Sequence, residues 1–264
     1  MALSKFERLL DQAIRAEKGG ETPLSYWRDF FMRLRSAADD EPVRDEEIAS
    51  HLTAAFDREF RRASKQHCGI PAFTIERLKP AMRSKLDERI VQAADLIKLR
   101  RRESIENTLA RFAGWSSSLP EMRKRIDLRE VREHIYKPIA QIKYERRRVA
   151  IDQTHKLVAS IHEVIADEGG AVAMIWRSNW RQVNYNYRVD HKERDGKVWI
   201  LPNTWATRAG LIRRSSPRYD TITHVAEEPY CRCYATWLYA LDEIPAEMLT
   251  AKGVSYARQM EAAA

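Results

Sequence analysis

Three side chains able to bind a metal ion occur in the C-terminal half of the sequence. Cys231 and Cys233 are separated by one residue, and His191 lies forty residues earlier. Thiolate and imidazole are common ligands of zinc in proteins. We therefore consider a metal site formed by His191, Cys231 and Cys233, with Asp190 or His224 as a fourth ligand. The alternative is that the two cysteines pack under a turn without a metal ion. Structural zinc is therefore the one cofactor that we consider, and no other is expected.

The spacing of the two cysteines sets a geometric condition on such a site. Alternate residues of a regular strand have Cα atoms about 6.6 Å apart. Two sulfurs bound to one zinc ion lie about 3.8 Å apart, because each Zn–S bond is about 2.3 Å long. A bulge or bend must therefore bring the thiols together. A disulfide across one residue would be strained, and the total of three cysteines indicates folding in a reducing compartment.

Two catalytic interpretations are less favoured, so we expect no enzymatic activity. His67 and Cys68 could form a thiol nucleophile, but no Asn or Asp partner is identifiable for them. The Asp190–His191 pair with Asn203 is superficially similar to the hairpin of metal-dependent nucleases, but a second histidine at helical spacing is absent.

Positive charge is concentrated between residues 98 and 148. This stretch holds 15 Lys and Arg against 7 Asp and Glu, and the excess equals the net charge of +8 of the whole chain. A solvated helical face is one interpretation. The other is a surface that contacts nucleic acid or an acidic protein partner. The candidate contact residues are the three basic clusters Arg100, Arg101, Arg102, Arg123, Lys124, Arg125, Arg146, Arg147 and Arg148.

Apolar periodicity predicts that helices precede these C-terminal residues. Helices are expected from Ser4 to Gly19, over residues 24–34, from Asp45, from Pro80 to Gly114, over 121–136 and over 151–168. Beyond Gly169–Gly170 the pattern favours strands over 171–176, 184–189, 197–201 and 231–239, with a hairpin turn at Asp195–Gly196 and a short C-terminal helix from Ile244–Pro245. No apolar run approaches the roughly 20 residues that span a bilayer, and no signal-peptide core is present at the N-terminus.

Four short motifs occur in order between residues 146 and 239. They are Asp152-Gln153-Thr154 followed by Lys156, a strand ending in Trp176, His191 with Gly196, and Cys231-Arg232-Cys233. In this order they resemble the phage head-morphogenesis family of Mu F-like minor head proteins. The sequence departs from the family pattern at Arg194, where the family has Leu. The first 75 or so residues carry no resemblance.

The resemblance implies a bacteriophage virion component rather than an enzyme. Such minor head proteins are present in few copies, associate with the portal, and assist procapsid assembly and genome packaging or delivery. The implied partners are the portal protein, the major capsid protein and, without sequence preference, packaged DNA. The implied locations are the head interior or portal vertex, and the host cytoplasm during assembly. The alternatives are a metal-dependent DNA nuclease and a non-specific DNA-binding protein.

The sequence therefore predicts an α+β protein, with a long-helix body followed by a small mixed module of short antiparallel strands. The expected divisions are an N-terminal helical segment over 1–75, a long-helix body with the basic stretch over 76–168, the head-morphogenesis module over 169–245 and a C-terminal helix or tail over 246–264.

Overall fold

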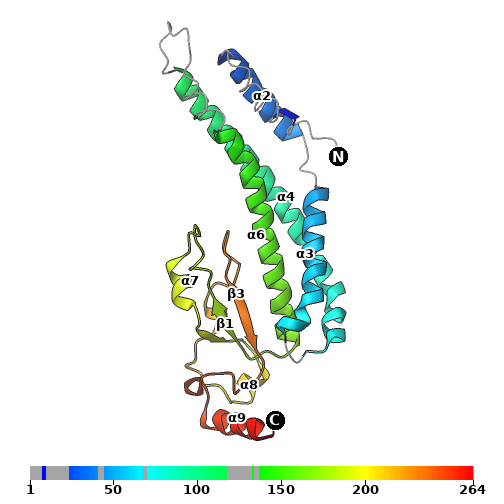
Figure 1. The fold of residues 1–264 in the computed structure, drawn as a ribbon, viewed down its shortest axis with the longest axis vertical. Coiled ribbons are helices and arrows are strands. Elements are labelled where there is room, and N and C mark those ends of the chain that lie inside the picture. The colour runs from blue at the N-terminus through cyan, green and yellow to red at the C-terminus, as the bar shows by residue number, and fades with distance from the viewer. Residues whose placement is uncertain are drawn as a thin grey trace. The chain divides into compact units, whose positions relative to one another are not determined.

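The computed structural model describes residues 8–9, 24–40, 45–67, 70–117, 133 and 137–263. The chain forms two compact units. One contains Met1–Ala49 and Ile90–Ala150, and the other contains Ser50–Arg89 and Ile151–Ala264. Long helices and a small antiparallel sheet make this an α+β fold, as predicted (Figure 1). The four divisions drawn from composition stay a prediction. The units follow tertiary contacts, so helical residues before Gly169 belong to the unit that contains the sheet.

The first unit is built from helices with apolar faces. Helix α2 (Leu24–Asp40) buries Phe31 and Leu34, and Phe31 packs against Phe112 of α4 (Ala72–Ser117) with ring centroids 5.5 Å apart. Helix α3 (Asp45–Gln66) begins where predicted, and most of it belongs to the second unit. The predicted helices from Ser4 and over 121–136 lie outside the described residues, except for 8–9 and 133.

The first residues of two helices differ from those predicted. Helix α4 begins at Ala72, after Pro71, whose carbonyl accepts the Thr74 N–H at 3.0 Å. Pro80, the predicted first-turn residue, lies inside this helix, where it removes one backbone hydrogen bond. The prediction failed because the buried side chains of α4 run past the proline on both sides. Helix α6 (Lys137–Glu168) carries Pro138 in its first turn and begins fourteen residues before the helix predicted over 151–168.

The second unit contains a three-stranded antiparallel sheet with the strand order β2-β1-β3. The central strand β1 (Ala173–Arg177) pairs with β2 (Val198–Ile200) and β3 (Tyr234–Leu238). Two buried clusters contain alternate residues of β1: Ala173 belongs to one, and Met174 and Trp176 belong to the other. Helices α7 (Val189–Arg194), α8 (Trp205–Arg208) and α9 (Ala251–Ala263) complete the module, with α8 and α9 together beyond one end of the sheet (Figure 1).

Several predicted strand boundaries are wrong. Residues 184–189 form no strand, because Asn184 has a positive φ of 61° and α7 starts at Val189. The Asp195–Gly196 turn joins α7 to β2 rather than two strands; Gly196 supplies the positive φ of 76° that this turn requires. Strand β3 starts at Tyr234, so both C-terminal cysteines precede it, and the last helix starts at Ala251 rather than near Ile244.

Candidate metal centre

The His191 side chain is fixed inside the module by a short helix and a buried indole. It lies in α7, and it is 1% exposed. Its ring packs edge-on against Trp176 of β1, with centroids 5.1 Å apart and an interplanar angle of 66°. The Gly196 N–H donates to the Trp176 carbonyl oxygen at 2.8 Å, which ties the end of the α7 turn to the strand. The imidazole is therefore buried and oriented before any ligand binds.

The two cysteines lie in an irregular segment that leads into β3. Tyr230 has a positive φ of 60°, and the Cys231 N–H donates to the Glu228 carbonyl oxygen at 3.1 Å. The Cys233 N–H in turn donates to the Cys231 sulfur at 3.5 Å. This is the departure from a regular strand that the spacing of the cysteines required.

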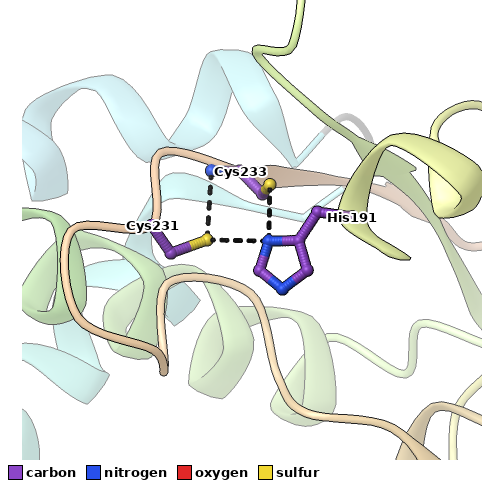
Figure 2. Close-up of side chains that lie close together, drawn as sticks. All are labelled: His191, Cys231 and Cys233. Atoms are coloured by element: carbon purple, nitrogen blue, oxygen red, sulfur yellow. Dashed lines mark hydrogen bonds between the residues drawn. The ribbon is translucent and has the colours of Figure 1, made fainter. Parts of the chain in front are cut away.

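Together these elements place three ligand atoms at one point. His191 Nδ1 lies 3.5 Å from Cys231 Sγ and 3.4 Å from Cys233 Sγ (Figure 2). The ligand atoms of the three residues all lie within 4.8 Å of one another, and all three residues are buried. The structure thus brings together the three metal ligands proposed from the sequence, and the group can hold a metal ion.

The two thiols differ in acidity because they share a proton. A hydrogen bond from Cys233 lowers the pKa of Cys231 to about 6 against the opposing effect of burial, with help from backbone N–H groups and from His191. The hydrogen bond to Cys231, together with burial, raises the pKa of Cys233 well above its ordinary value. Ser178 and Trp176 act in the other direction, because their polar hydrogens favour a thiolate at Cys233. A metal ion bound to both sulfurs would displace the shared proton.

The opposite nitrogen of His191 faces carboxylates. Nε2 is buried and forms no hydrogen bond with the described residues, but Glu228 Oε2 lies 3.7 Å away and Asp190 Oδ2 lies 3.8 Å away. Carboxylates in this position commonly orient a metal-binding histidine through its second ring nitrogen. The geometry therefore favours an orienting role for Asp190 rather than the fourth-ligand role suggested by the sequence.

His224, the other proposed fourth ligand, is engaged elsewhere. Its Nδ1 pairs with Glu163 at 2.8 Å, and its ring stacks on Tyr219 with centroids 4.4 Å apart. Among the described residues, the group that can hold a metal ion comprises His191, Cys231 and Cys233 alone.

The Asp152 motif of α6 supports the cysteine segment. Asp152 Oδ1 accepts the backbone N–H of Tyr230 at 2.5 Å, and Asp152 Oδ2 accepts from Gln153 at 3.4 Å and pairs with Lys156 at 3.3 Å. Arg232, between the cysteines, is half-buried and donates to Gln182 at 3.3 Å. All four motifs that carry the family resemblance therefore meet in one part of the second unit.

The predicted basic contact residues are only partly described. Arg100 and Arg102 are exposed, whereas Arg101 is only 9% exposed. Arg147 is exposed, and Arg148 is half-buried and pairs with Glu145. The cluster Arg123, Lys124 and Arg125 and the Arg146 side chain lie outside the described residues. A partner role for these residues stays a prediction.

A buried group that the sequence did not reveal joins three distant segments. His67 Nε2 and His162 Nδ1 lie 2.9 Å apart, and His67 Nδ1 is hydrogen-bonded to the Tyr239 hydroxyl. Sequence reasoning considered His67 only as a neighbour of Cys68, which lies outside the described residues. The single available signal was the position of His162 beside the buried Ile161 on α6.

No helix in the described part of the chain is long and apolar enough to cross a membrane. Comparison of the whole chain with known proteins found no matching family model, no similar curated protein and no similar solved structure.

Proposed function

We propose that the chain is a bacteriophage minor head protein whose C-terminal module is stabilised by a structural zinc ion. In this role it is a low-copy virion component at the portal that assists procapsid assembly and genome packaging or delivery. The observation that carries the proposal is the meeting of Asp152, Trp176, His191, Cys231 and Cys233 in one buried site. The resemblance rested on the order of four motifs in the sequence. Their proximity gives a physical reason for that order, because together they build and support one group of ligands.

The two nitrogen–sulfur distances fit zinc. With Zn–N bonds of about 2.0 Å and Zn–S bonds of about 2.3 Å, a tetrahedral angle separates nitrogen from sulfur by about 3.5 Å. A planar trigonal arrangement would separate them by about 3.7 Å, using the same bond lengths. The observed separations of 3.4 and 3.5 Å agree with the tetrahedral case. Three ligands at tetrahedral angles leave the fourth position for a water molecule or another small ligand.

Burial of the ligands favours a structural role. His191 is 1% exposed, Cys231 is 1% exposed and Cys233 is 4% exposed. A zinc ion in this position would link α7 to the segment before β3, which are forty residues apart in sequence. The ion would neutralise the buried thiolates, and binding would contribute directly to the free energy of unfolding.

The ligand chemistry disfavours the nuclease alternative. Magnesium, the usual metal of phosphoryl transfer, binds oxygen ligands in octahedral geometry. Two sulfurs and an imidazole instead select zinc or another soft ion.

Metal analysis of purified protein tests the zinc site. We expect about one equivalent of zinc in the wild-type protein, because structural zinc is held tightly. Cys231→Ser and Cys233→Ser should lose it, whereas Cys68→Ser, the matched control at the third cysteine, should retain it. A wild-type content below about one-tenth of an equivalent would exclude the site.

The assembly role has a separate test. We expect the gene to lie directly downstream of terminase and portal genes, and an amber mutation in it to reduce the yield of DNA-filled heads. Wild-type protein supplied in trans should restore the yield. A normal yield of infectious, filled heads without the protein would refute the assembly role and leave the zinc site unaffected.

A further inference from the structure

The segment between β1 and α7 combines aromatic and basic side chains on an exposed surface. Residues 177–197 contain six Lys and Arg against three Asp and Glu, together with Trp180, Tyr185 and Tyr187. Arg181 and Lys192 are exposed, as is Tyr187.

The aromatic rings of this segment hold the cations in place. The Arg181 guanidinium lies 4.8 Å from the centroid of the Trp180 ring, and the Lys192 ammonium lies 4.6 Å from the same ring. Lys192 also lies 5.5 Å from the Tyr187 ring. Arg232, between the two cysteines, lies 5.4 Å from the Tyr185 ring. Cation–π contacts of this kind orient the charges and leave their N–H groups able to donate to a ligand.

Three nearby carboxylates, those of Asp190, Asp195 and Glu228, bind other partners. Asp195 accepts from the Ser178 N–H at 2.8 Å and from Trp180 Nε1 at 2.9 Å, which fixes the indole. Asp190 pairs with Arg194 at 2.8 Å, and Glu228 pairs with Arg188.

The three cations that lie over the aromatic rings differ from Arg188 and Arg194, because they have no carboxylate partner among the described residues. None of Arg181, Lys192 and Arg232 forms an ion pair with a carboxylate in the described part of the chain. These cations therefore favour an external anion.

We propose that Arg181, Lys192 and Arg232, with Trp180 and Tyr187, form a binding surface for single-stranded nucleic acid. The cations would contact successive phosphates, and the rings would contact bases and sugars, since base–aromatic stacking tolerates any sequence. An acidic peptide would use the charges but not the rings. Exposed amides at residues 182, 184 and 186 add donors and acceptors that suit base edges. This proposal does not depend on the head-protein role.

Fluorescence anisotropy with a labelled 15-nucleotide oligo-dT tests the surface in the full-length, metal-loaded protein. Each lost phosphate contact on a single strand lowers the salt slope of log K by about 0.7, so the variant Arg181→Ser/Lys192→Ser should lower it by about 1.4. Affinity at 0.1 M salt should fall roughly 10- to 30-fold. The control Arg214→Ser/Arg258→Ser removes the same charge from exposed sites on the same unit and should change affinity less than about twofold.

Two further measurements identify the partner. Tyr187→Leu keeps every charge and should weaken oligo-dT binding while leaving binding to poly-glutamate unchanged. Poly-glutamate that competes as well as oligo-dT at equal charge would overturn the proposal in favour of an acidic protein partner. Tighter binding to a duplex than to the single strand, or an equal loss in the control variant, would also overturn it. Zinc content and far-UV circular dichroism equal to wild type establish that each variant is folded.

Discussion

The second unit should lose stability steeply between pH 7 and pH 5, because His67 and His162 are buried as neutral imidazoles. His67 is fully buried, His162 is 8% exposed, and their facing nitrogens lie 2.9 Å apart. Burial lowers the pKa of His162 to about 4, and burial together with the nearby His162 lowers the pKa of His67 to about 4. Protonation of both rings would place two positive charges in contact inside the core.

The sign and size of the effect follow from the difference between the folded and unfolded states. In the unfolded chain a histidine has a pKa of about 6.5. Between that value and about 4 the unfolded state binds more protons, so the free energy of unfolding falls as the pH falls. The stability is therefore complete above pH 6.5 and is lost progressively toward pH 4. From pH 7 to pH 5 the loss is about 2 kcal/mol for each histidine, or roughly 4 kcal/mol for the pair.

Urea unfolding followed by circular dichroism at pH 7, 6 and 5 measures this loss. The variant His162→Asn should show about half of the wild-type loss, although it starts from a lower stability. His51→Asn, at an exposed position of α3, is the control and should show the full loss. Because wild type and variant share the metal group, subtracting their pH profiles removes its contribution. An equal loss in wild type and His162→Asn would refute the argument.

Two further substitutions test the packing around the metal centre and the helix end that precedes the sheet. Asp152→Ala removes the acceptor of the Tyr230 N–H and should lower the free energy of unfolding by about 2 kcal/mol. Asp152→Asn keeps an acceptor and should lower it less. In a zinc competition titration, only the Ala variant should bind zinc more weakly than wild type. Gly169→Ala would press a Cβ atom against the Ile70 side chain and should cost about 1–3 kcal/mol by thermal unfolding. Gly114→Ala, inside α4, meets nothing within 4 Å and should instead raise stability by about 0.5–1 kcal/mol. An unchanged melting temperature for Gly169→Ala would contradict the packing described.

Helical periodicity and single turn residues carried most of the correct fold predictions. The faces of α2 and α3 were readable because large apolar residues recur at helical spacing, and α6 ends at Gly169–Gly170 as the sequence indicated. Pro80 misled the prediction because a long packed helix tolerates one proline when its buried contacts continue on both sides. Local propensity does not include that tertiary compensation.

Alternation misled the strand predictions near the metal centre. Tyr185, Tyr187 and Val189 alternate as in a strand, yet Asn184 adopts a positive φ and the tyrosines lie beside cations. Aromatic residues on a surface loop produce the same period as a half-buried strand, and only the partner strand could distinguish them. The sheet consists of β2, β1 and β3, and residues 184–189 pair with none of these strands.

The cysteine segment explains why spacing alone could not define the metal centre. Its bend depends on the hydrogen bond from Tyr230 to Asp152, 78 residues away on α6. The position of the imidazole depends on Trp176, which β1 places beside α7. Each support is an ordinary residue in its own segment, so no local pattern marks it as part of a ligand site. A histidine and two cysteines can be proposed as ligands from chemistry, but their distance is set by a helix and a strand whose contribution becomes visible only when the segments are packed together.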